Sequence, residues 1–394
     1  MAKDILAGIR VVDFTWHLTG PLTTKALSDC GAEVFRIESR RAPDIQRTGA
    51  RYGSFNQYNT SKLGVTLNVS TPKGLELVKK LIAVSDIVVE NFAGGAIERM
   101  GLGYEVLKKI KPDIIMLSSC MQGQTGPSAK SPGSGHKLTA LAGFNNITGW
   151  PDRAPGWIGA YTDFIAPRYN IIAILAALDY RRRTGKGQYL DMSQYENSAH
   201  FMAPMVLDYA ANNRVLGRIG NQCLHAAPHN AYRCLGDDRW CSIAVFTDDE
   251  WLSFVKVIGS PAWTNDPRFA TMLGRKESED ELDRLITEWT SKRTAEDVMT
   301  QLQAAGVAAG VVETGEDLLD KDAQFKHRGT FVTLEHPEVG HYRTQSGPHG
   351  IMSRYQYNVR RAPLLGEHNE YVFKKVLGLA DAEYDQLVKD QVIY

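Results

Sequence analysis

The fold of this chain is decided by three consecutive segments, Ile9-Arg-Val-Val-Asp-Phe14, Pro21 to Cys30 and Ala32-Glu-Val-Phe-Arg-Ile37, which read as strand, helix and strand. The same alternation continues downstream, with helices expected at 71–83 and 104–110 and strands at 86–90 and 113–117. Short apolar strands separated by helices are typical of a parallel sheet that is covered on both faces. The sequence therefore predicts an α/β fold with a Rossmann-like sheet.

Parallel sheets of this kind bind ligands beyond the carboxyl ends of their strands. In this chain those ends are followed by the segments Thr15 to Gly20, Glu38 to Arg41, Asn91 to Gly95 and Ser118 to Gly123. We expect a ligand site among these loops.

The downstream part of the chain predicts a second, smaller α+β unit. A strand pair is expected within Tyr232 to Phe246, and helices are expected at Asp248 to Ile258 and within Glu277 to Ala305, where Thr294 is a candidate helix cap. A further strand is expected at Gly306 to Val312, and residues 367–394 are expected to be largely helical.

An acidic residue, Asp163, is expected on a turn directly before a long helix that contains the strongly apolar run Ile171 to Leu178. A helix that is apolar on nearly every face is usually buried, so we expect the helix entrance and Asp163 to lie inside the protein. Gly185 and Gly187 after the helix are expected to adopt positive φ and end it. Read locally, Asp163 is either a capping aspartate or a functional carboxylate.

Composition excludes several classes of function. The chain has 394 residues with 45 basic and 45 acidic side chains, so no global field favours nucleic acid or an anionic membrane. Its longest apolar run is far shorter than the roughly 20 residues that span a bilayer, and its start lacks a signal-peptide core. Five cysteines without a Cys-x-x-Cys pair predict neither a disulfide framework nor a metal site, and favour a cytoplasmic protein.

Several motifs together resemble the class III coenzyme A transferases, the family of formyl-CoA:oxalate and carnitine CoA-transferases. The motifs run in the family's order over nearly the whole chain: Val11-Val-Asp-Phe-Thr15, Gly31 to Glu38, Asn59-Thr-Ser-Lys62, Val89-Glu-Asn-Phe92, Arg99-Met-Gly-Leu102, Thr184-Gly-Lys-Gly-Gln188 and Pro363-Leu-Leu-Gly366. The resemblance implies a large CoA-binding domain at 1–224, a small α+β domain at 225–325 and a return segment at 326–394. It also implies an interlocked dimer, either a homodimer or a heteromer with a related subunit.

The resemblance further implies that Asp163 is the catalytic nucleophile, which reacts through an aspartyl anhydride and an aspartyl-CoA thioester. An aspartate with an ordinary pKa of about 3.9 is anionic at pH 7 and needs no general base to attack a thioester. The substrates implied are an acyl-CoA and a carboxylic acid, with no permanently bound cofactor. The residues implied to bind CoA are His17, Leu18, Arg40, Leu67, Asn91, Phe92, Arg99 and Met100.

Two other functions stay open from the sequence. The α-methylacyl-CoA racemases resemble this family and use a histidine followed by aspartate, whereas His136 here is followed by Lys137. A CoA-binding subunit of a heteromeric transferase is the second alternative. The glycine-rich loop of formyl-CoA transferases has no counterpart in residues 220–229, where His225 and His229 are candidates to approach the acyl group.

The acceptor acid is predicted only as a hypothesis. Aromatic residues such as Tyr161, Phe164 and Tyr169 flank Asp163 and suit a bulky acyl group. Arg153 and Arg168 are candidates for a second carboxylate. The pattern is similar to the branch of the family that acts on substituted succinates such as benzylsuccinate, with succinyl-CoA as the donor.

Overall fold

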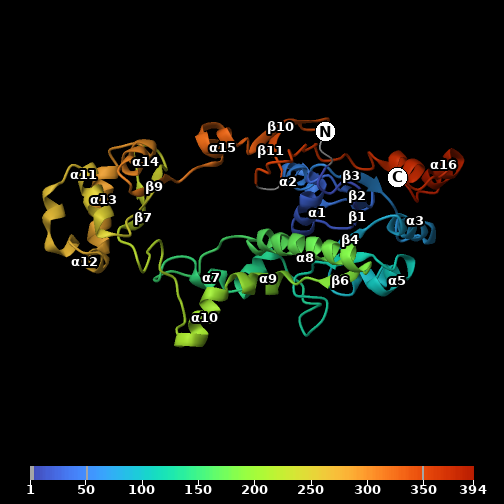
Figure 1. The fold of residues 1–394 in the computed structure, drawn as a ribbon, viewed down its shortest axis with the longest axis horizontal. Coiled ribbons are helices and arrows are strands. Elements are labelled where there is room, and N and C mark those ends of the chain that lie inside the picture. The colour runs from blue at the N-terminus through green and yellow to red at the C-terminus, as the bar shows by residue number, and fades with distance from the viewer. Residues whose placement is uncertain (1–3, 50–51, 348–349) are drawn as a thin grey trace. The chain divides into compact units, whose positions relative to one another are not determined.

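The computed structural model describes residues 4–49, 52–347 and 350–394 (Figure 1). The chain divides into two compact units. Unit 1 comprises residues 1–144, 158–215 and 324–394, and unit 2 comprises 145–157 and 216–323. The resemblance implies a small domain at 225–325 and does not anticipate that residues 145–157 associate with the downstream segment.

Unit 1 contains a six-stranded sheet in the order β3-β2-β1-β4-β5-β6 with all neighbouring pairs parallel. This order is that of the doubly wound dinucleotide-binding folds, so the predicted α/β class is confirmed. The strands are β1 (Arg10–Asp13), β2 (Glu33–Glu38), β3 (Leu63–Thr66), β4 (Ile87–Glu90), β5 (Ile115–Ser118) and β6 (Gln188–Asp191). Four of them are predicted from the sequence. β3 and β6 are not, because Gly64 interrupts the first and polar ends bound the second.

Alternate residues of the strands pack into two different cores. Val12 contributes to the core that includes Leu77 and Leu81 of α3 (Pro72–Ala83). Val11 contributes to the core that includes Leu27 of α1 (Thr19–Asp29) and Ile174 of α8 (Thr162–Thr184). Helices therefore cover both faces of the sheet, as a nearly continuous apolar strand requires. Figure 1 shows α8 alongside α1 on one of these faces.

The helices of unit 1 vary widely in length. They are α1 (Thr19–Asp29), α2 (Tyr52–Tyr58), α3 (Pro72–Ala83), α4 (Ala96–Arg99), α5 (Tyr104–Ile110), α6 (Gly135–Leu141), α7 (Phe144–Ile147, which reaches into unit 2), α8 (Thr162–Thr184), α9 (Gln194–Phe201) and α10 (Ala203–Asn212), with a 3₁₀ turn η1 at Ile45–Arg47.

The C-terminal segment returns to unit 1. Ile393 bridges Leu67, and Val372 and Phe373 join the core of the sheet. Its elements are α15 (Ala323–Arg328), the antiparallel pair β10 (Phe331–His336) and β11 (Gly340–Gln345), the π-helical turn η6 (Tyr371–Val376) and α16 (Asp381–Lys389).

Unit 2 is an antiparallel three-stranded sheet with helices, the α+β character that the sequence predicts. Thr294 caps α14 by accepting a hydrogen bond from the Asp297 amide, which confirms the predicted cap. The elements are β7 (His229–Arg233), β8 (Trp240–Ala244), β9 (Ala308–Val311), α11 (Asp248–Val257), α12 (Met272–Glu277), α13 (Glu279–Thr290) and α14 (Ala295–Ala304), with short turns η3 (Ala262–Asn265), η4 (Pro267–Phe269) and η5 (Asp317–Lys321).

The structure corrects two expectations about helix α8. The helix is not buried on all sides, since Ile172 is 65% exposed and Leu175 is 44% exposed in the single chain. Gly185 adopts φ +71° and ends the helix as predicted, but Gly187 is not among the positive-φ glycines. A Cβ on Gly187 would lie 2.0 Å from the carbonyl oxygen of Ile114, so this glycine permits a close backbone approach instead.

Candidate active site

Asp163 lies in the first turn of α8 and next to the start of α1. The Thr19 hydroxyl, on the first residue of α1, is 3.5 Å from the backbone oxygen of Asp163. Helix α1 follows the carboxyl end of β1, so Asp163 lies at the edge of the sheet where ligands are expected. The helix cap is Tyr161, without a side-chain capping bond, so Asp163 is not the capping residue of α8.

The Asp163 carboxylate packs against the backbone of Gly135 at the start of α6. A Cβ on Gly135 would lie 2.5 Å from Oδ2 and 2.6 Å from Oδ1 of Asp163. The Thr162 hydroxyl fixes the same contact by donating to the Gly135 carbonyl oxygen over 3.2 Å. Only glycine leaves room for the carboxylate here, a requirement that the sequence analysis does not identify.

Burial raises the pKa of Asp163 to about 6, while the Thr19 hydroxyl and the His136 side chain oppose the rise. The expected ordinary value is therefore wrong, because the sequence cannot show how far the carboxyl group is desolvated. At pH 7 the group is still mostly ionised, and its place at a helix N-terminus favours the anion. Burial, together with the Asp163 charge, raises the pKa of Tyr58, so this phenol also lies near the carboxylate.

Two of the predicted CoA-binding segments meet at the point where the strand order reverses, between β1 and β4. Asn91 accepts from the Trp16 amide over 2.9 Å and donates to the Trp16 carbonyl oxygen over 2.9 Å. His17 follows with an exposed side chain and φ +64°, and Leu18 precedes α1. The structure therefore brings His17, Leu18 and Asn91 together at the usual ligand position of this fold.

Phe92, Arg99 and Met100 follow β4 on the same edge. The side chains of Phe92 and Met100 are half-buried against the core, and Arg99 is exposed in the last turn of α4. The Phe92 amide donates to Glu90 Oε2 over 2.6 Å, and burial raises the pKa of Glu90 to about 7. An exposed guanidinium beside apolar side chains suits a ligand that carries phosphates and an apolar chain.

Arg40 and Leu67 lie on the other side of β1, beyond the ends of β2 and β3. Arg40 is exposed, whereas Leu67 is 1% exposed and belongs to the hydrophobic core. The Leu67 side chain is therefore committed to packing.

Several residues considered from the sequence are distributed between the two units. His225, His229 and Arg153 belong to unit 2, where the His229 Nδ1 atom is 2.6 Å from the Asn221 carbonyl oxygen. Arg168 is exposed on α8 of unit 1.

His136 is the residue whose position the sequence leaves least defined. Its interaction with Asp163 places it beside the carboxylate. Lys137, which follows, donates to Ser131 Oγ over 2.6 Å and to the Pro132 carbonyl oxygen over 2.9 Å. Lys137 therefore stabilises the loop before α6. It follows His136 directly, as an aspartate follows the histidine of the racemases, and it does not take over the role of that aspartate.

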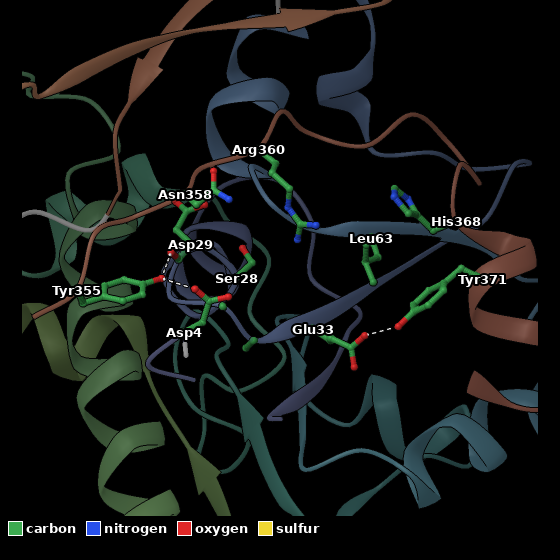
Figure 2. Close-up of a pocket in the computed structure, with 12 residues that line it drawn as sticks. Asp4, Ser28, Asp29, Glu33, Leu63, Tyr355, Asn358, Arg360, His368 and Tyr371 are labelled. Carbon is green, nitrogen blue, oxygen red and sulfur yellow. Dashed lines mark hydrogen bonds between the residues drawn. The ribbon is translucent and has the colours of Figure 1, made fainter. Parts of the chain in front are cut away.

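A pocket of about 380 Å³ lies at the opposite edge of the sheet (Figure 2). Glu33 and Leu63, which line it, are the first residues of β2 and β3, so the pocket is at the amino ends of these strands. Figure 2 shows Tyr371 donating to Glu33, over 2.5 Å. This pocket is separate from the candidate site at the carboxyl ends.

In residues 4–49, 52–347 and 350–394, no helix is long and apolar enough to cross a membrane. The same ranges hold no cluster of three or more side chains that could ligate a metal ion.

The doubly wound sheet with a carboxylate beside its ligand edge is the architecture of an α/β ligand-binding protein, and comparisons with known proteins identify its family. Residues 6–369 match the model of CoA-transferase family III, so the chain belongs to this family and is a CoA-transferase. It is 32% identical to succinyl-CoA:D-citramalate CoA-transferase of Chloroflexus aurantiacus over 98% of both chains. It is 30% identical to the beta subunit of succinyl-CoA:L-malate CoA-transferase of the same organism, again over 98% of both chains.

A solved structure supports the same assignment. A CaiB/BaiF family protein from Brucella suis is 30% identical in sequence and superimposes with a TM-score of 0.89, covering 95% of this chain and 100% of that one. The predicted family and fold class are confirmed.

Proposed function

We propose that this CoA-transferase moves CoA from succinyl-CoA to a dicarboxylic acid through covalent intermediates on Asp163. The observation that carries the proposal is the position of Asp163, a partly buried carboxylate at the ligand edge of the sheet with a pKa of about 6. The relatives named above use succinyl-CoA as a substrate together with citramalate or malate, which are both dicarboxylic acids. We extend that substrate class to this chain.

The reaction needs no group beyond the carboxylate and the two substrates. An Asp163 oxygen attacks the thioester carbonyl carbon, the C–S bond breaks, and a mixed anhydride and CoA thiolate form. The thiolate attacks the Asp163 carbonyl carbon and releases succinate, which leaves an aspartyl-CoA thioester. The acceptor carboxylate then attacks this thioester and expels the thiolate, and the thiolate attacks the acceptor carbonyl of the new anhydride. Acceptor-CoA leaves and the Asp163 carboxylate is restored.

The surroundings of Asp163 suit these steps. Gly135 presents backbone instead of a side chain, so the Asp163 carboxylate packs directly against the start of α6. The Thr19 hydroxyl, at the start of α1, lies next to Asp163 and favours developing negative charge. Partial desolvation makes the carboxylate a better nucleophile than one in water.

For the acceptor we keep the hypothesis of a substituted succinate such as benzylsuccinate. The rings of Phe144, Tyr161 and Phe201 form a cluster in which centroids lie 5.5 to 6.4 Å apart, near the start of α8. Such a surface suits an aryl substituent. Arg168 is an exposed cation on the same helix, and it is our candidate to bind the second carboxylate of the acceptor.

The mechanism is tested by mass spectrometry of the protein after incubation with succinyl-CoA and trapping with hydroxylamine or borohydride. We expect a modification confined to the peptide that contains Asp163 in the native protein and none in the Asp163→Ala variant. Modification at any other carboxylate, or none in a protein that transfers CoA, would contradict the proposed nucleophile.

His136 beside Asp163 is the one observation that favours a racemase activity as a second candidate. A racemase removes the proton next to the thioester, and the two groups needed must face each other across the substrate. The same incubation in deuterated water distinguishes the two functions, because exchange of the α-proton without CoA transfer would establish the racemase.

We also propose that the chain functions as an interlocked dimer. None of the ten residues of α10, all within the described part of the chain, is buried, and Val206 and Leu207 are 61% and 67% exposed. Phe201 of α9 and Ile172 of α8 add to this apolar surface of unit 1. A helix that packs no face against the rest of the protein is only marginally stable in water. We therefore expect a second copy of the chain to bury the apolar surface of α10.

Interlocked subunits cannot separate unless they unfold. We therefore expect gel filtration at nanomolar concentration to give the mass of a dimer, with no monomer on dilution. A monomer peak that grows on dilution would contradict interlocking. A monomer mass at every concentration would contradict the dimer itself, and co-purification of a second related chain would indicate a heteromer.

A further inference from the structure

The loop between β1 and α1 is held almost entirely by side chains from other elements. The Thr15 amide donates to Asp13 Oδ1 over 2.8 Å, and the Thr15 carbonyl oxygen accepts from Arg36 Nη1 over 2.9 Å. Asn91 bonds both backbone groups of Trp16, and the His17 amide donates to Asp44 Oδ2 over 3.1 Å. Five consecutive backbone groups therefore have side-chain partners in place of secondary structure.

Asp44 and Arg36 connect this loop to the interior. Arg36 Nη2 lies 2.6 Å from Asp44 Oδ2, the same oxygen that accepts from the His17 amide. The Arg36 side chain is fully buried and Asp44 is 5% exposed. Asp44 Oδ1 accepts from the Gln46 amide over 3.0 Å, which fixes the aspartate at the start of η1. One buried carboxylate therefore joins the loop, the guanidinium and η1.

The conformation that these contacts hold is not one that the loop would favour alone. His17 has φ +64°, and a residue with a Cβ costs about 1 kcal/mol or more in the left-handed region. The exposed rings of Trp16 and His17 lie 4.7 Å apart, centroid to centroid, on the surface of the ligand edge. This strained loop displays two aromatic rings, and buried side chains hold its backbone in place. The loop is therefore pre-organised for binding.

On the basis of the proposed function, we propose that Asp44 is a positioning residue for acyl-CoA binding, which acts through the His17 amide and Arg36 and touches no substrate itself. Its role is to hold residues 15–18 in the bound conformation before the CoA chain arrives. Without it, binding has to order the loop, and affinity falls by the cost of that ordering.

Asp44→Asn tests the role, because asparagine keeps the size and one acceptor oxygen but loses the charge that pairs with Arg36. We expect the dissociation constant for free CoA, measured by calorimetry, to rise about tenfold. The KM for the acyl-CoA should rise in proportion, while kcat and the KM for the acceptor acid stay within about threefold.

Asp29→Asn is the matched control. Asp29 is also a buried carboxylate paired with a buried cation, Lys25, but it lies at the far end of α1, about 15 Å along the helix from the loop. We expect Asp29→Asn to lower thermal stability about as much as Asp44→Asn does. Its dissociation constant for CoA should stay within twofold of the wild-type value. Equal weakening by both variants, or unchanged affinity in Asp44→Asn, would overturn the proposal.

Hydrogen exchange of the wild-type protein keeps the test independent of how well the variants fold. A peptide covering residues 14–20 should exchange slowly in the free protein, and CoA should change its exchange little. Fast exchange that slows only when CoA binds would show that the loop is not pre-organised and would overturn the proposal. Absence of CoA binding by the wild-type protein would instead overturn the proposed function.

Discussion

Replacing Asp163 by asparagine is expected to lower the rate of CoA transfer at least about 1000-fold, because the step that forms the anhydride loses its nucleophile. The amide has nearly the same shape as the carboxyl group, so substrate binding should persist. The measurement is kcat with succinyl-CoA and an active acceptor, together with the dissociation constant for CoA. A variant that retains a tenth of the wild-type rate would exclude Asp163 as the nucleophile.

The same substitution should stabilise the fold at neutral pH. Burial raises the pKa of Asp163 from 3.8 to about 6, so between these values the folded state holds a proton that the unfolded state has lost. The contribution of Asp163 to the free energy of unfolding is therefore fully present below about pH 4 and is lost as pH rises through about 6. The difference between the two pKa values corresponds to about 3 kcal/mol at pH 7.

Asp163→Asn removes that cost, so its free energy of unfolding should exceed that of the wild type by about 2 to 3 kcal/mol at pH 7 and by little at pH 4. Chemical denaturation of both proteins across this range measures the difference. The rate of the wild-type enzyme should fall as pH is lowered through about 6, since the protonated carboxyl is not a nucleophile. A stability difference that does not change between pH 4 and 7 would contradict the raised pKa.

Lys62→Met is expected to cost about 3 to 5 kcal/mol of folding free energy, the second large effect. The Lys62 ammonium is fully buried, 3.0 Å from Asp13 Oδ2, 2.9 Å from Asn59 Oδ1 and 3.1 Å from the Pro21 carbonyl oxygen. Burial lowers the pKa of Lys62 to about 8, so it is still charged at pH 7. Methionine fills similar volume but leaves the buried Asp13 carboxylate without its nearest cation.

Urea titration at pH 7 measures this loss, with Lys80→Met as the control. Lys80 pairs with Glu76 on the exposed side of α3, where both side chains are nearly half exposed, so its loss should change stability little. If Lys62→Met is no less stable than Lys80→Met, the buried pair contributes no more than a surface one.

The local pattern of the sequence accounts for much of the fold. Helix α5 is predicted with its observed bounds, Tyr104 to Ile110, and the Thr294 cap and the end of α8 at Gly185 are correct. These features depend on residues close together in the chain, where periodicity, caps and glycine conformations act. The position of Asp163 before an apolar helix is also local, but it left open a capping or a functional role, and only the family motifs along the whole chain singled out this residue.

Tertiary structure alone decided the chemistry around Asp163. Gly135, Tyr58 and Thr19 are far from it in sequence, and the pKa near 6 depends on how far the folded chain removes water from the carboxyl group. The support of the His17 loop by Asp44 likewise joins residues 27 positions apart. The sequence by itself determined four of the six strands of the large sheet, helix α5, the Thr294 cap and the carboxylate that stands near the start of α8. Desolvation and long-range contacts, which depend on packing, decided what that carboxylate can do.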